Sequence, residues 1–479
     1  MKLLVIDVGT SGVRAAVVDA TARVLHSHRR EVLPSSPAPG LVEFDATALA
    51  DAVLAVARDA VAEAGGVDGV GIANQRASTI VWDRATGEPV GPGLGWQDLR
   101  TVVECLTLQG QGFRVAPNLS VTKAAHLLDL ADPDRARDLC IGTVDTWIVW
   151  HLTGGAHHVT DATNVGISGF RTPDQADWDH PLLEALRIPA DALPRVVDSV
   201  GVVAEATALD GAPPIAGILG DQQASLLGQG CVSHGQAKIT FGTGGMLDVC
   251  LDERPRYATQ GSGGTFPIVA RGLDGDRRWG LEAVMLAAGT NIEWLRDDLG
   301  IISTAAESHD LAAQVPDTGG VAYVPALLGL GTPTWDYGAR GALLGLTRGS
   351  GRPQIVRAVL EGIAQRAADL VDAAEADGAT SIPVLRVDGG MTANPTFVQL
   401  LADATGRPVE VSPEREATTL GAAYAAGLAL GAWGGDDEIA ALWAPEAAVS
   451  PQAPLDRERW ADTLRRAEGW FPELSAISF

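Results

Sequence analysis

The sequence is poor in lysine and in positive charge overall. Only three of its 35 basic residues are lysines (Lys2, Lys123 and Lys238), and 60 acidic residues outnumber them. The formal net charge of -25 opposes binding to nucleic acid or to an anionic membrane surface. No GxxxxGK[ST] motif occurs anywhere, which excludes a P-loop nucleotide site.

Cysteine and long apolar runs are also scarce. The four cysteines (Cys105, Cys140, Cys231 and Cys250) show no CxxC or His-paired spacing. This spacing favours reduced, mostly buried thiols over disulfides or a metal centre. No apolar run approaches transmembrane length, and the N-terminus enters a strand pattern at once. We therefore expect a cytoplasmic protein that does not insert into a membrane.

The size of the chain and its element pattern predict two large α/β domains. A chain of 479 residues that is 46% hydrophobic exceeds what one hydrophobic core usually supports. Strand patterns at the N-terminus are followed by a predicted helix at Ala46–Ala64, and a second strand-turn-strand pattern begins at Lys238. A further helix is predicted from about Glu282 to Asp298. We expect domains at residues 1–229 and 230–479.

Two glycine-rich turns are the most informative motifs. One follows Val5-Ile6-Asp7 as Gly9-Thr10-Ser11-Gly12, and the other is Gly242-Thr243-Gly244-Gly245. Apolar residues flank both, which predicts β-hairpins whose turns expose backbone N–H groups that can cradle a phosphate. Either turn alone is more often an ordinary hairpin. Asp7 beside the first turn favours a bound Mg²⁺, and two such turns suggest a nucleotide held between two related domains.

A carboxylate stands at the end of another predicted strand. Residues 213–219 lead into Gly220-Asp221-Gln222-Gln223, and ligands of open α/β sheets bind at the carboxyl ends of strands. Asp221 can accept a proton from a substrate hydroxyl there. It can also cap the helix that follows, and the two roles are compatible.

Nine stretches follow one another along the chain: Asp7–Ala15, Asn74–Arg76, Trp96–Asp98, Gly142–Trp147, Gly220–Gln223, Phe241–Gly244, Gly341–Leu346, Val387–Gly390 and Thr418–Ala423. In this order they resemble the motifs of the FGGY family of carbohydrate kinases, and within it those of the glycerol kinases. The resemblance implies two ribonuclease H-like domains, of the actin, sugar kinase and chaperone ATPase type, with an interdomain cleft that closes over ATP and substrate.

The resemblance assigns roles to individual residues. It implies ATP-dependent phosphorylation of a hydroxyl, with Asp221 as general base and Asp7 as the Mg²⁺ partner. Glu293 stands where the family usually has glutamine, so its nucleotide contact is open. The implied ATP-binding residues are Thr10, Ser11, Gly12, Arg14, Gly242, Thr243, Gly289, Glu293, Gly389, Gly390 and Asn394; the implied substrate-binding residues are Arg76, Ala77, Trp96, Asn118, Asp221, Gln222 and Met246.

Three of the pocket positions depart from the glycerol kinase pattern. Ala77 stands where glutamate is expected, Asn118 where tyrosine is expected and Met246 where phenylalanine is expected. Losing a buried carboxylate removes a charged hydrogen-bond acceptor worth about 1.5–3 kcal/mol. A small triol would underfill the enlarged pocket, so we predict a longer polyol or a ketose as substrate.

Two alternatives stay open. The chain can be an authentic glycerol kinase that makes glycerol 3-phosphate with a rebuilt pocket. It can also be a non-kinase ATPase switch or sugar-binding regulator of the same fold, although a pure switch has no reason to keep Arg76, Trp96 and Asp221 together. The sequence leaves open whether the chain forms a homodimer or a homotetramer.

Overall fold

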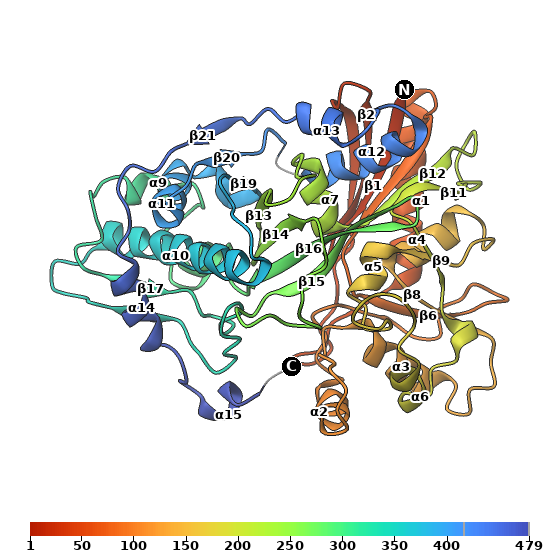
Figure 1. The fold of residues 1–479 in the computed structure, drawn as a ribbon, viewed down its shortest axis with the longest axis horizontal. Coiled ribbons are helices and arrows are strands. Elements are labelled where there is room, and N and C mark those ends of the chain that lie inside the picture. The colour runs from red at the N-terminus through yellow and green to blue at the C-terminus, as the bar shows by residue number, and fades with distance from the viewer. Residues whose placement is uncertain (415–416, 478–479) are drawn as a thin grey trace.

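A large mixed sheet runs through the whole molecule (Figure 1). The computed structural model describes residues 1–414 and 417–477. In spatial order the sheet consists of β21 (Ala447–Val449), β20 (Val409–Val411), β19 (Leu385–Asp388), β13 (Ala237–Phe241), β14 (Gly245–Leu251), β16 (Asp276–Met285), β15 (Phe266–Leu273), β11 (Val200–Glu205), β12 (Pro214–Gly220), β5 (Gly69–Asn74), β1 (Lys2–Val8), β2 (Gly12–Asp19) and β3 (Val24–Glu31).

The same strand pattern occurs twice in this sheet. In the first half β1 pairs antiparallel with β2 and β2 with β3, while β5 and then β12 add in parallel on the other side of β1. In the second half β13 pairs antiparallel with β14 and β14 with β16, while β19 and β20 add in parallel. The halves join where β11 runs parallel to β15. The predicted pair of ribonuclease H-like units is therefore confirmed.

An apolar core lies on one face of each half. In the first half α1 (Ala46–Ala64) packs its buried face on the strands, with the Asp45 side chain capping its start and Gly65 in the left-handed region at its end. In the second half α10 (Arg352–Gly378) and α11 (Pro395–Thr405) complete the core. Figure 1 shows both helices beside the second half, away from β1. The opposite face of β13, β14 and β16 carries polar side chains.

Two helices connect the halves. Helix α7 (Asp221–Gly228) continues from β12 and packs on β13 and β14, whereas α12 (Ala417–Leu430) packs on β12 and β5. The helices approach so closely that a Cβ at Gly228 would lie 1.9 Å from the Ala417 carbonyl oxygen, and a Cβ at Gly421 would lie 1.7 Å from that of Ala224. Only glycine permits this approach, which fixes Asp221 at the junction of the halves.

One predicted helix is wrong. Glu282 lies in strand β16, and only short helical segments, Thr290–Glu293 and Trp294–Asp298, occur near the predicted helix's end. Each residue from Trp279 to Met285 has a partner in β14, and this pairing overrides the helical spacing of the apolar residues. Helix α7 begins directly at Asp221, without a connecting loop after β12.

Other predictions hold. All four cysteines are buried and free, and α1 has the predicted bounds. In the part of the chain that the structure describes, no helix is long and apolar enough to cross a membrane.

A smaller sheet and the remaining helices flank the large sheet. The smaller sheet has the order β4 (Glu43–Phe44), β7 (Gly93–Leu94), β6 (Thr79–Asp83) and β8 (Leu139–Thr143). The other elements are α2 (Val102–Gly110), α3 (Ser120–Ala131), α4 (Val144–Leu152), β9 (Val159–Asp161), α5 (Ala162–Gly166), α6 (His180–Ala185), β10 (Arg195–Val197), α8 (Thr290–Glu293), α9 (Glu307–Ala312), β17 (Ala322–Val324), β18 (Ala342–Leu344), α13 (Asp436–Ala441), α14 (Arg457–Arg465) and α15 (Pro472–Ser475).

Candidate active site

The two glycine-rich turns are hairpin tips at matching positions in the two halves. The first joins β1 to β2 and is closed by the Gly9 N–H, which donates to the Gly12 carbonyl oxygen at 3.0 Å. The second joins β13 to β14, with Phe241 and Gly245 as its last paired residues. Ser11, Gly242 and Thr243 are exposed, so both turns present backbone and hydroxyl groups outward. This arrangement suits contact with phosphate oxygens.

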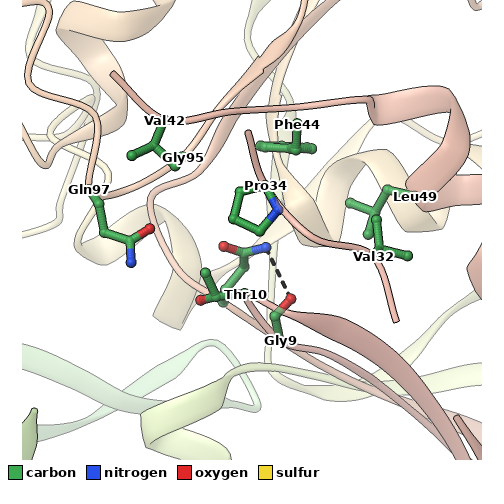
Figure 2. A pocket seen from close by; sticks show the side chains of 10 residues that line it. Gly9, Thr10, Val32, Pro34, Val42, Phe44, Leu49, Gly95 and Gln97 are labelled. Atoms are coloured by element: carbon green, nitrogen blue, oxygen red, sulfur yellow. Dashed lines mark hydrogen bonds between the residues drawn. The ribbon is translucent and has the colours of Figure 1, made fainter. Parts of the chain in front are cut away.

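A small cavity lies behind the first turn (Figure 2). Its volume is about 10 Å³, and Gly9, Thr10, Phe44 and Gln97 are among the residues that line it. The space suffices for about one water molecule, so it is a packing gap that backs the turn rather than a substrate pocket. The Gln75 amide reaches across it and donates to the Gly9 carbonyl oxygen at 3.2 Å.

Asp7 is a carboxylate with an elevated pKa beside the first turn. It faces Arg14 across the β1–β2 register. Burial raises the pKa of Asp7 to about 6; the Arg14 charge lowers it and the Asp221 charge raises it further. A cation would therefore stabilise the ionised form of Asp7. No group of three or more acidic, histidine or cysteine side chains suited to a metal occurs among the described residues, so Mg²⁺ would need phosphate oxygens and water as its other ligands.

Asp221 begins α7 at the carboxyl end of β12. Its Oδ1 lies 3.4 Å from Arg76 Nε, and its side chain is 30% exposed. Burial raises the pKa of Asp221, and the Arg76 guanidinium opposes that shift. A carboxylate with an elevated pKa that substrate can still reach is suited to accept a proton.

Arg76 links Asp221 to the second half of the molecule. Its Nη2 lies 2.6 Å from Glu282 Oε2 in β16, and its Nη1 donates to Gln223 Oε1 at 3.4 Å. Burial raises the pKa of Glu282 to about 7, against the opposing charge of Arg76. The carboxylates of Asp221 and Glu282 both pair with the Arg76 guanidinium, so it has little capacity left to bind an anionic substrate. Sequence reasoning missed Glu282, although a lone acidic residue within the apolar stretch 279–285 was a usable signal.

Lys238 and Asp248 form a second ion pair that sequence reasoning missed. Lys238 Nζ lies 2.7 Å from Asp248 Oδ2, and both side chains have 0% exposure. The same Nζ donates to Gln222 Oε1 at 2.7 Å and to Thr240 Oγ1 at 2.9 Å. Lys238, Asp248 and Glu282 face one another across β13, β14 and β16. Lys238 and Asp248 stand four residues before and after the three-residue hairpin tip, so the register of the hairpin sets them opposite one another.

Three predicted pocket residues come together around Lys123. Its Nζ donates to the backbone carbonyl oxygens of Asn118 at 2.9 Å, Trp96 at 3.3 Å and Ala77 at 3.5 Å. Ala77 has φ 60°, a left-handed conformation that these bonds help to hold. The Trp96 indole donates to Thr10 Oγ1 at 3.3 Å, which ties this wall to the first turn.

Met246 belongs to the polar face of the second half. It is half-buried and faces Thr240 in β13 and Val284 in β16. Because side chains alternate along a strand, Met246 lies on the same side of β14 as Asp248. Met246 therefore lies next to Asp248 on this face, beside the Lys238–Asp248 ion pair that contacts Gln222.

The predicted ATP-binding residues outside the two hairpin tips come together only in part. The Gly289 N–H donates to the Gly242 carbonyl oxygen at 2.9 Å. A Cβ at Gly389 would lie 2.4 Å from the Phe241 carbonyl oxygen, so both glycines contact the second hairpin. The Asn394 side chain caps α11 and donates to Ser308 Oγ. The Glu293 side chain is exposed. Gly390 follows Gly389 in the same turn, and open space surrounds its Cβ position.

Comparison with known proteins supports the family resemblance. The model of the FGGY family of carbohydrate kinases, N-terminal domain, matches residues 2–228, and that of the C-terminal domain matches residues 237–430. The chain is 44% identical to a protein named glycerol kinase from Trichlorobacter lovleyi, with 98% of this chain and 99% of that one covered. It is 42% identical to another glycerol kinase, from Aromatoleum aromaticum, with the same coverage.

Solved structures agree. The glycerol kinase of Plasmodium falciparum with ADP superposes with a TM-score of 0.89 at 27% identity and covers 100% of this chain and 99% of its own. A ligand-bound xylulose kinase from Lactobacillus acidophilus shares the fold with a TM-score of 0.83 at 21% identity, covering 98% and 97%. The chain therefore belongs to the FGGY family of carbohydrate kinases and is an ATP-dependent enzyme that phosphorylates a polyol or sugar.

Proposed function

We propose that the enzyme transfers the γ-phosphate of ATP in line to a hydroxyl of a neutral polyol or ketose, with Asp221 as general base. The observation that carries this proposal is the group of Asp221, Arg76 and Glu282. Asp221 is an accessible carboxylate with a raised pKa. The Arg76 guanidinium is already paired with this carboxylate and with that of Glu282. An uncharged acceptor fits such a site better than a sugar acid.

In this mechanism the acceptor hydroxyl approaches Asp221, and Asp221 Oδ takes its proton as the oxygen attacks the γ-phosphorus. The bond between the γ-phosphorus and the β–γ bridging oxygen breaks as the new bond forms, and ADP leaves. Arg76 keeps the carboxylate oriented through its Nε. The hairpin tips at Thr10 and Thr243 supply hydroxyl and N–H donors to the phosphates. Bound Mg²⁺ supplies neutralisation of phosphate charge, and Asp7 is the residue that would hold it.

The pocket substitutions favour an acceptor longer than glycerol. Ala77 is buried and supplies no carboxylate, while Asn118 is exposed and Met246 is half-buried. Glycerol is the second candidate, because the relatives at 42–44% identity bear the name glycerol kinase.

ADP release across a panel of glycerol, erythritol, larger alditols, ketopentoses and ketohexoses tests the acceptor class. We expect turnover of a larger polyol or ketose that Asp221→Asn lowers at least a hundredfold. Asp59→Asn, on the exposed face of α1, is the matched control and should behave as wild type. Strong turnover of glycerol alone would establish the second candidate, and turnover of none would favour an ATPase switch or a regulator.

Adding the missing carboxylate tests the pocket argument. Ala77→Glu restores the acceptor group that glycerol kinases carry, so it should shift the ratio of kcat/KM values toward glycerol by about tenfold. An unchanged ratio would mean that position 77 does not contribute to acceptor choice. Ala77→Ser, which fills less space and adds no charge, is the control.

A further inference from the structure

Lys238 contacts a substrate residue of the opposite half. It belongs to β13, whereas Gln222 belongs to α7, and Nζ lies 2.7 Å from Gln222 Oε1. We infer that Lys238 and Asp248 are positioning residues that orient the Gln222 amide so that its Nε2 donates to an oxygen of the acceptor. This inference rests on the proposed function, because Gln222 is there a substrate contact.

The orientation follows from hydrogen-bond chemistry. An ammonium group has only donors, so it must face the oxygen of an amide and never its nitrogen. With Oε1 held by Lys238, rotation of the amide by half a turn would set two donors against each other. No described residue accepts a hydrogen bond from Gln222 Nε2, and the side chain is half-buried. Its two N–H donors are therefore available to a ligand.

Asp248 holds the Lys238 side chain in place. Both side chains have 0% exposure, and an unpaired charge so deeply buried would be strongly unfavourable. Thr240 Oγ1 accepts a second hydrogen bond from Nζ at 2.9 Å, which fixes its direction. The other charged groups near the pair are Asp221, Arg76, Glu282 and Asp388, since each lies close enough for its pKa to respond to one member of the pair.

The consequence concerns which substrates bind. An acceptor must present a hydroxyl or carbonyl oxygen with a free lone pair to Gln222 Nε2. A deoxy analogue that lacks this oxygen would leave the donors unpaired, and sites built on such donors discriminate strongly. The ion pair thus adds acceptor selectivity without touching the acceptor.

The test replaces the pair by apolar residues of similar volume. The double variant Lys238→Met/Asp248→Leu removes both charges, which avoids a stranded ion and favours folding. We expect the acceptor KM to rise about five- to tenfold, with kcat within about twofold and the KM for ATP unchanged, because one oriented neutral hydrogen bond is lost. The matched control is Arg386→Met/Glu410→Leu. It removes a neighbouring cross-strand ion pair with a 3.5 Å separation and should leave the acceptor KM unchanged.

A second variant keeps the inference testable if the double variant does not fold. Gln222→Glu keeps the side-chain shape and can pair with Lys238, but it has no N–H donor, so the acceptor KM should again rise. An unchanged acceptor KM in either folded variant overturns the inference. Asp221→Asn separates this outcome from the proposed function. If it abolishes turnover while the acceptor KM of the pair variants is unchanged, only the inference fails. Full turnover by Asp221→Asn would refute the proposed function.

Discussion

Each half of the molecule buries one lysine beside the proposed acceptor site, and the two are held in opposite ways. Lys238 in the second half pairs with the carboxylate of Asp248, whereas Lys123 in the first half donates to three backbone carbonyl oxygens. Burial lowers the pKa of Lys123 to about 7, and the Asp98 charge only partly opposes this shift; within residues 1–414 and 417–477 no carboxylate pairs with its ammonium. The comparison teaches that one lysine forms a buried ion pair within the second half and donates a hydrogen bond to Gln222 of the first half. The other gathers the pocket wall and can lose its charge near neutral pH.

Removing the charge of Lys238 alone should have the largest effect. Lys238→Met leaves the fully buried Asp248 carboxylate unpaired, which costs about 3–5 kcal/mol of unfolding free energy. Denaturant unfolding of this variant and of the double variant with Asp248→Leu measures the difference. The double variant should recover most of the loss. If both unfold at the same denaturant concentration, the pair is not the reason for the instability.

Removing Lys123 should cost less. Lys123→Met strands no opposite charge and loses only hydrogen bonds to the carbonyl oxygens of Ala77, Trp96 and Asn118, about 1–3 kcal/mol in all. The acceptor KM should rise while the KM for ATP changes little, since these three residues form the proposed acceptor wall. A loss larger than that of Lys238→Met would reverse the comparison.

The two lysines also predict a pH dependence. Since the pKa of Lys123 falls from 10.5 to about 7 on folding, the unfolded chain holds one more proton between these values. The contribution of Lys123 to stability therefore rises as the pH increases from about 7 to 10. Unfolding curves over this range should show a shallower rise in Lys123→Met than in wild type. Identical slopes would mean that Lys123 keeps its charge in the folded enzyme.

The smallest effect is expected at the first hairpin. Asp7 has a pKa of about 6, and a proton competes with Mg²⁺ for its carboxylate, so the Mg²⁺ concentration for half-maximal activity should rise as the pH falls from 7 to 5. Asp7→Asn should weaken activation and abolish this dependence. Asp59→Asn, on the exposed face of α1, is the control. A pH response that survives in Asp7→Asn would contradict the role of Asp7.

The sequence predicted much of this arrangement and missed specific parts for physical reasons. Glycine turns with apolar flanks predicted both hairpins, and family motifs predicted that Arg76 and Asp221 share a site. Glu282 was missed because the apolar residues of 282–298 also fit a helical period. Residues 279–285 form a strand because they pair with β14, and this pairing is not visible in the sequence.

Strand register accounts for the other omissions. That Lys238 faces Asp248 depends on how many residues the hairpin tip contains, and a change of one residue would turn the side chains to opposite faces. Lys123 meets Ala77, Trp96 and Asn118 through backbone oxygens, which no side-chain pattern encodes.

The destination of the γ-phosphate tests the central claim most directly. With γ-labelled ATP and the preferred acceptor of the panel, the label should appear in a phosphate ester of that acceptor for wild type and for Asp59→Asn. Asp221→Asn should form this ester at least a hundred times more slowly, because its amide cannot take the hydroxyl proton. Ester formation by Asp221→Asn at the wild-type rate, or label released only as inorganic phosphate by wild type, would contradict the account.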